Sequence, residues 1–101
     1  MRISDFNIGE KKVFVIAEIG NNHNGSLKLA LEMVDAATDA GADCVKFQMR
    51  NMASVYRKKS LSKDGEDLGT EYILDLLERF ELTLDEHRQI SQYCFQNKVL
   101  Y

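Results

Sequence analysis

The sequence lacks several features that mark particular classes of protein. It contains two cysteines, Cys44 and Cys94, which lie far apart and fit no metal-binding or redox spacing. No apolar run approaches the ~20 residues needed to cross a bilayer. No signal-peptide apolar region follows Met1. We therefore expect a soluble, cytoplasmic protein whose thiols stay free in a reducing compartment.

An excess of basic residues is also missing. The chain has 13 Lys and Arg against 16 Asp and Glu, which gives a net charge of −3. Nucleic acids and anionic membranes favour proteins with a basic face, so we expect neither as a partner. The composition is otherwise ordinary for a globular protein, and 101 residues suffice for one small domain with its own core.

Hydrophobic patterning predicts a strand, a helix and a second strand in the first half of the chain. Residues 12–18 form a nearly unbroken apolar run, which is typical of a strand buried on both faces. Apolar residues then recur at helical spacing after Ser26, a suitable N-cap, and stop before Gly41. Residues 43–48 predict the second strand. Such a βαβ unit implies parallel strands joined by a right-handed crossover.

The second half of the chain continues the alternation. Residues 49–69 are polar and irregular, and loops of this length are usually functional or disordered. Helical spacing returns at residues 73–80, and Thr83 with Glu86 has the form of a capping box that starts a further helix. Residues 99–101 resemble the opening of a third strand.

Two βα units and the start of a third cannot close a parallel sheet, whose strands are normally covered on both faces. The pattern matches the opening of a (β/α)₈ barrel of the TIM type, which typically has ~250 residues. We therefore expect an α/β chain in which residues 1–101 are a single N-terminal fragment of such a barrel.

Polar side chains crowd the first strand-to-helix turn, residues 18–25, at the strand end where α/β proteins bind ligands. Glu18, expected at the last position of the strand, is a candidate general acid/base or substrate anchor. Bonding to the amides of its own turn is the alternative. His23 is a candidate metal ligand or acid/base, but holding the turn by hydrogen bonds with Asn22 and Asn24 is an alternative of at least equal weight. The turn lacks the Lys-Ser/Thr of a phosphate loop, which argues against nucleotide binding.

Lys46 and Gln48 alternate along the second strand and share one face, which points inward in a barrel. A lysine there needs an anion, because an unpaired buried ammonium is costly. Either a phosphate or carboxylate ligand or Glu18 on the neighbouring strand would serve. Three polar side chains that converge from two strands favour a binding site over an isolated ion pair.

Two blocks of sequence resemble the opening of the sialic acid synthase family, which includes N-acetylneuraminate synthases and relatives that make legionaminic or pseudaminic acid. The blocks are Ala17-Glu18-Ile19-Gly20-x-Asn22-His23-x-Gly25 and Ala40-Gly41-Ala42-Asp43-x-Val45-Lys46-Phe47-Gln48. The spacing between them also matches.

The resemblance implies a transferase that condenses phosphoenolpyruvate with an N-acetylmannosamine-type sugar to give a sialic (nonulosonic) acid and phosphate. Lys46 is similar to the family's lysine that holds the phosphoenolpyruvate anion, and Gln48 to its hydrogen-bonding neighbour. Glu18 is similar to the glutamate at the reacting centre. Asn22 and His23 belong to the same motif and are predicted to bind substrate.

The resemblance further implies a divalent metal, manganese or magnesium, that activates the sugar aldehyde. The family's metal-binding histidines lie in later strands, so no metal ligand is expected in this fragment. A C-terminal antifreeze-like domain and a homodimer complete many family members. We therefore expect the 101 residues alone to be inactive and poorly folded.

Two other functions remain open from the residues themselves. Another phosphate-handling barrel lyase or aldolase would use Lys46 as a Schiff-base amine. A small α/β binding module would use the same polar turn without catalysis.

Overall fold

The computed structural model describes residues 1–9, 12–50 and 75–101. A short antiparallel hairpin, β1 (Arg2–Ile3) and β2 (Phe6–Asn7), comes first. The main body follows, with β3 (Ile16–Gly20), α1 (Leu27–Asp39), β4 (Cys44–Phe47) and α4 (Leu84–Gln96). Residues 75–79 are also helical.

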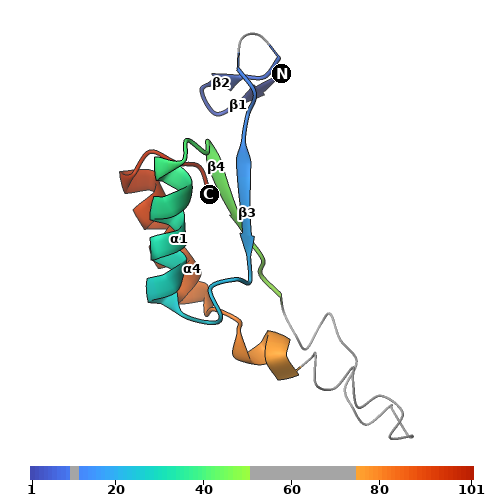
Figure 1. Ribbon diagram of the computed structural model, residues 1–101, viewed down its shortest axis with the longest axis vertical. Coiled ribbons are helices and arrows are strands. Elements are labelled where there is room, and N and C mark those ends of the chain that lie inside the picture. Colours follow the sequence, from blue (N-terminus) through green and yellow to red (C-terminus); the bar gives the residue numbers. More distant parts are fainter. Residues whose placement is uncertain (10–11, 51–74) are drawn as a thin grey trace, which may run out of the picture.

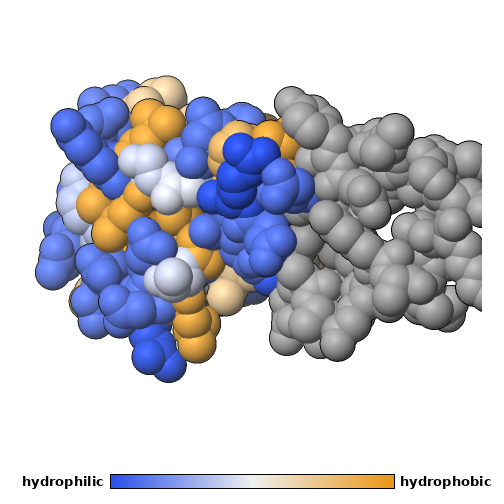
Figure 2. Space-filling view, turned by 90° about the horizontal axis from the view of Figure 1, so that it is seen from below, coloured by the Kyte–Doolittle hydropathy of each residue, from blue (hydrophilic) through white to orange (hydrophobic). Residues whose placement is uncertain are grey.

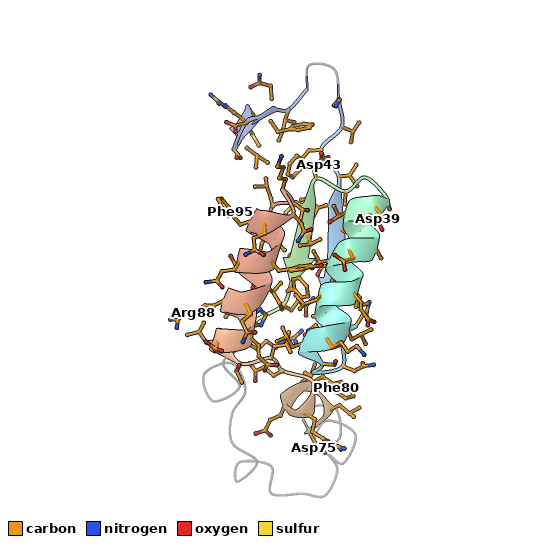
Figure 3. The ribbon with its side chains drawn as sticks, turned by 90° about the vertical axis from the view of Figure 1, so that its left-hand side faces the viewer. Asp39, Asp43, Asp75, Phe80, Arg88 and Phe95 are labelled. Atoms are coloured by element: carbon orange, nitrogen blue, oxygen red, sulfur yellow. The ribbon has the colours of Figure 1, made fainter. Side chains whose placement is uncertain are left out.

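The centre of the molecule is the predicted βαβ unit. β3 and β4 pair in parallel, with Ala17 opposite Val45 and Glu18 opposite Lys46. Both α1 and α4 lie on one side of this strand pair, as Figure 1 shows from the edge and Figure 3 from the helical side. The hairpin lies at the amino end of β3, away from the carboxyl ends of the strands (Figure 1).

A third strand position lies beside β4. Leu100 forms a parallel bridge with Cys44. The Val45 N–H donates to the Leu100 carbonyl at 2.8 Å, and the Leu100 N–H donates to the Asp43 carbonyl at 3.1 Å. The predicted strand opening at residues 99–101 therefore pairs where the next strand of a parallel sheet belongs.

The core fills the space between the two helices and the strands. Its fully buried side chains are Ala30 and Val34 of α1, Val45 of β4, and Ile90 and Cys94 of α4. Cys94 is a free thiol, and burial raises its pKa to about 11. Cys94 thus behaves as a small hydrophobic side chain on the buried face of α4.

The helix ends also follow the sequence signals. Ser26 Oγ accepts from the Leu29 N–H at 3.1 Å, and Gly41 has the left-handed φ of 91° expected just past the helix. Thr83 and Glu86 form both hydrogen bonds of a capping box, at 3.1 and 3.0 Å. The predicted loop at 49–69 lies almost wholly outside the described residues.

The first strand differs from its prediction in extent and burial. It begins at Ile16 rather than near residue 12 and runs two residues past Glu18. Val13 is 82% exposed and Ile16 is 52% exposed. The helices cover one face of the strand pair. Among the described residues, the other face of this apolar run is therefore left uncovered. The hairpin was not predicted. Phe14 contacts it edge-on through Phe6, with the two ring centroids 5.1 Å apart.

Gly25, the last residue of the polar turn, packs against a distant segment. Its φ is +77°, and a Cβ placed there would lie 2.8 Å from the Arg79 carbonyl oxygen and 3.3 Å from Phe80 Cα. Such contacts with backbone cannot be relieved by a rotamer change. A glycine is therefore required both for its backbone angle and for this close approach. Among the described residues, no helix is long and apolar enough to cross a membrane.

Alanine substitutions at Gly25 and Gly41 should differ in their effect on stability. Both residues have positive φ, but a Cβ at Gly41 would meet nothing within 4 Å. Gly41→Ala should cost only the backbone strain of about 1–2 kcal/mol. Gly25→Ala should cost clearly more, because the 79–80 backbone must also move. Urea unfolding of both variants of the full-length protein measures the difference. Equal losses of unfolding free energy would contradict the close approach.

Candidate functional site

The site lies at the carboxyl ends of β3 and β4, where an acid and a base face each other. Lys46 Nζ is 2.8 Å from Glu18 Oε2, and the two residues are direct partners in the strand register. Both side chains remain open to solvent, at 61% exposed for Lys46 and 47% for Glu18. Glu18, one of the partners that the sequence allowed for Lys46, therefore pairs with it, at the surface rather than in the core.

Asp43 fixes the register that creates this pair. Its carboxylate Oδ2 accepts from the Val15 N–H at 2.9 Å, and the Asp43 N–H donates to the Val15 carbonyl at 2.9 Å. A one-residue slip would turn every side chain of β4 to the opposite face. Sequence reasoning did not assign a role to Asp43, because its partner Val15 lies 28 residues away in the chain.

Gly20 leaves space between the side chains of Glu18 and Gln48. The register shifts between Glu18 and Gly20, and Gly20 has a φ of 59°. A Cβ at this position would lie 3.5 Å from Glu18 Oε1 and 3.6 Å from Gln48 Nε2. The polar ends of Glu18 and Gln48 thus lie around the same backbone position.

A second cation joins the site from the end of β4. Arg50 Nη2 donates to Gln48 Oε1. Arg50 was not among the predicted site residues. Its signal was available, because Lys46, Gln48 and Arg50 follow the same alternation. The Gln48 amide is thereby oriented, with its oxygen toward Arg50 and its nitrogen on the Gly20 side.

The two remaining predicted residues lie in different surroundings. Asn22 is exposed in the turn, where its N–H donates to the Ile19 carbonyl at 3.1 Å. His23 is 1% exposed, and its Nδ1 accepts from the Gly25 N–H at 3.0 Å. Burial, with a smaller effect of His87, lowers the pKa of His23, so the ring is neutral near pH 7. Its hydrogen bond lies within the turn, but the partner is Gly25 rather than Asn22 or Asn24.

Figure 2 views the molecule from below Figure 1, the side toward which the arrows of β3 and β4 point. Hydrophilic residues cover much of the described surface in this view, and hydrophobic ones show between them. Within residues 1–9, 12–50 and 75–101, no group of three or more His, Cys, Asp or Glu side chains is placed to hold a metal ion. The described residues therefore do not fit a metal centre, and an anion is the ligand that Lys46, Arg50 and the Gln48 amide suit.

A family model places the chain among known proteins. Residues 33–101 match the model of the NeuB family. The chain belongs to the NeuB family. Similar curated proteins of this group include the N,N'-diacetyllegionaminic acid synthase of Campylobacter jejuni, which is 39% identical over 94 residues. The spore coat polysaccharide biosynthesis protein SpsE of Bacillus subtilis is 38% identical over 92 residues.

These alignments cover most of the chain but little of the relatives. They include 90% and 88% of this chain, and 28% and 24% of the two proteins. The chain thus spans about a quarter of the length of the curated relatives it matches. The resemblance to sialic acid synthases seen in the two sequence blocks is confirmed.

Solved structures agree with this assignment. The sialic acid synthetase of Leptospira borgpetersenii, crystallised with citrate, superposes with a TM-score of 0.77 at 31% identity. That alignment covers 99% of this chain and 32% of the other. The crystal structure of SpsE gives a TM-score of 0.68 at 33% identity, with 98% and 25% covered. The α/β arrangement of this NeuB chain is therefore that of sialic acid synthases and is consistent with a barrel of the TIM type.

The Glu18–Lys46 pair should contribute little to stability. Exposed ion pairs are typically worth about 0–1 kcal/mol, because water already solvates both charges. Glu18→Gln and Lys46→Met should each change the free energy of unfolding by less than about 1 kcal/mol. Glu32→Gln, an exposed glutamate on α1, is the matched control. A loss of several kcal/mol in urea unfolding would mean that the pair is a structural element rather than an available site.

Proposed function

We propose that this chain supplies the first part of a synthase that condenses phosphoenolpyruvate with an N-acetylmannosamine-type amino sugar, giving a nonulosonic acid and phosphate. The observation that carries the proposal is the Glu18–Lys46 pair at the ends of two adjacent parallel strands, with the Gln48 amide beside it. The names of the relatives support it, since sialic, legionaminic and pseudaminic acid synthases are among them.

Lys46 is proposed to hold the phosphoenolpyruvate anion. In the structure its ammonium group contacts Glu18, and both groups are half open to water. A phosphate or carboxylate oxygen can therefore replace Glu18 as the partner of Lys46 without a change in the fold. The Nε2 of Gln48 lies on the same side and would donate a second hydrogen bond to the anion. Arg50 keeps the amide in this orientation.

Glu18 is proposed to act at the reacting carbon. Once an anion occupies Lys46, the carboxylate loses its cation and is free to accept or deliver a proton. Asn22 is exposed in the same turn and is proposed to donate to the substrate. Contact of His23 with substrate stays a prediction. Its ring is buried and accepts a hydrogen bond from the Gly25 N–H.

The remainder of the enzyme is proposed to lie outside this chain. Residues 1–101 would form two βα units and the start of a third in a (β/α)₈ barrel. The later strands would supply the ligands of a manganese or magnesium ion, which as a Lewis acid would activate the sugar aldehyde. A C-terminal antifreeze-like domain, a homodimer and a cytoplasmic location complete the proposal. The sheet face opposite the helices, which includes the half-exposed Ile16, is the side that further strands would enclose.

Steady-state kinetics of the full-length protein that carries this chain would test these roles. Phosphate release is measured with phosphoenolpyruvate and N-acetylmannosamine. Glu18→Gln should lower kcat by two to four orders of magnitude, as loss of a general acid/base does. Lys46→Ala should instead raise the KM for phosphoenolpyruvate about 10- to 100-fold, because it removes a charge-assisted hydrogen bond.

The exposed α1 residues Lys28 and Glu32 provide matched controls. Lys28→Ala and Glu32→Gln change the same charges and should leave both constants unchanged. Borohydride trapping of a covalent adduct at Lys46 with a keto substrate would favour the Schiff-base alternative. Wild-type kinetics for both site variants would refute the assignment.

Residues 1–101 alone should release no phosphate from the two substrates. The reason is that the proposed metal ligands and most of the barrel are contributed by later strands. Turnover by this chain in the presence of Mn²⁺ or Mg²⁺, measured against the full-length protein at equal concentration, would contradict the division proposed here.

A further inference from the structure

Four aromatic rings from four separate segments meet beside the site. We call this group of His23, Phe47, His87 and Tyr101 the aromatic cluster. Phe47 is its centre, with ring centroids 5.9 Å from His23, 6.3 Å from His87 and 5.8 Å from Tyr101. The cluster joins the polar turn, β4, α4 and the third strand position.

Hydrogen bonds hold three rings of the cluster. His87 Nδ1 and the Tyr101 hydroxyl are 2.7 Å apart. His23 Nδ1 accepts from the Gly25 N–H, so the proton of the neutral ring is on Nε2. The Nε2 atoms of both histidines are buried and have no hydrogen-bond partner in the part of the chain that the structure describes. His23 is 1% exposed and His87 is 3% exposed.

The cluster is coupled to the site through the backbone of β4. Phe47 lies between Lys46 and Gln48, and its ring packs against the core while Lys46 faces solvent. Lys46 and Gln48 flank Phe47 on the same backbone, so packing that restrains Phe47 also restrains the segment that carries them. His87 and Tyr101 contact this ring from the side of α4 and the third strand, and His23 contacts it from the turn.

We propose that His87 and Tyr101 are positioning residues for the anion site, because their hydrogen bond holds Phe47 and thereby the placement of Lys46 and Gln48. The inference rests on the proposed function for the identity of the anion, and on the described contacts alone for the positioning.

The protonation state of the cluster makes the proposal testable by pH. Burial lowers the pKa of His87 and of His23 below the usual 6.5, and for His23 the charge of His87 acts in the same direction. The carboxylates that face them, Glu86 for both and Glu81 for His87, raise these pKa values by less. Burial also raises the pKa of the Tyr101 hydroxyl, which stays neutral.

The direction of the pH effect follows from these shifts. Above pH 6.5 both histidines are neutral whether the cluster is packed or open. As the pH falls below 6.5, the open state binds protons before the packed state does, so the packed cluster loses stability. The loss ends once the pH is below the lowered pKa values of the packed state. Acidification from pH 7 should therefore loosen the site through the cluster.

Three variants of the full-length protein separate this role from general stability. Tyr101→Phe removes the hydroxyl and keeps the ring. His87→Asn places an amide near the position of Nδ1, so it retains a hydrogen bond to Tyr101 but does not titrate. Tyr93→Phe is the matched control, because it removes the hydrogen bond from Tyr93 to Asp35, on the surface between α4 and α1.

Phosphoenolpyruvate binding is measured by titration calorimetry at pH 7.5 and 5.5. At pH 7.5, Tyr101→Phe should weaken binding about fivefold, as loss of one hydrogen bond does, whereas His87→Asn and Tyr93→Phe stay within about twofold of wild type. Between the two pH values the wild type should lose about fivefold more affinity than His87→Asn. The two proteins are compared because the phosphate monoester of the ligand itself titrates near pH 6 and affects both alike.

Hydrogen exchange of the segment 44–48, measured without ligand, keeps the two proposals distinct. Faster exchange in Tyr101→Phe than in Tyr93→Phe supports the positioning role. If the wild type fails to bind phosphoenolpyruvate, that result refutes the proposed function alone. Unchanged exchange together with unchanged binding in Tyr101→Phe overturns the inference. Parallel pH profiles for wild type and His87→Asn overturn its dependence on the histidine.

Discussion

The parallel pairing of β3 and β4 is the constraint on which the site depends. Asp43 holds the start of this pairing through its bonds to Val15. Three residues further on, the same register puts Glu18 opposite Lys46. The site is therefore a product of strand register, since neither side chain is fixed by burial and each remains half open to solvent. A chain with the same residues and a slipped register would present Lys46 to the core.

The polar turn after β3 combines two different kinds of residue. Glu18 and Asn22 are exposed and available for chemistry, whereas His23 and Gly25 face the interior and attach the turn to Phe47 and to the 79–80 backbone. A dense polar motif in a sequence thus includes buried supports as well as exposed side chains. Their separation follows from burial, which single-sequence patterns do not report for a short loop.

Much of the fold could be predicted from the sequence because its signals are local. Helix caps depend on two residues three positions apart, and the Thr83–Glu86 box formed as expected. The convergence of Glu18, Lys46 and Gln48 was also predictable, since parallel strands end at the same edge. What could not be predicted depends on contacts across the chain. The hydrogen bonds of Asp43 require Val15, and the hydrogen bond of His87 requires Tyr101. The limited burial of the first strand depends on what covers its second face.

The position of Cys94 gives the molecule a built-in chemical reporter. Thiolates, rather than thiols, react with alkylating reagents, and burial raises the pKa of this thiol to about 11. Its side chain is fully buried between α4 and the strands, so a reagent reaches it only when the packing of the helices opens. Cys44, which is partly exposed on β4, provides an internal reference in the same chain. The ratio of labelling at the two thiols would therefore record how often the core opens, without an added probe.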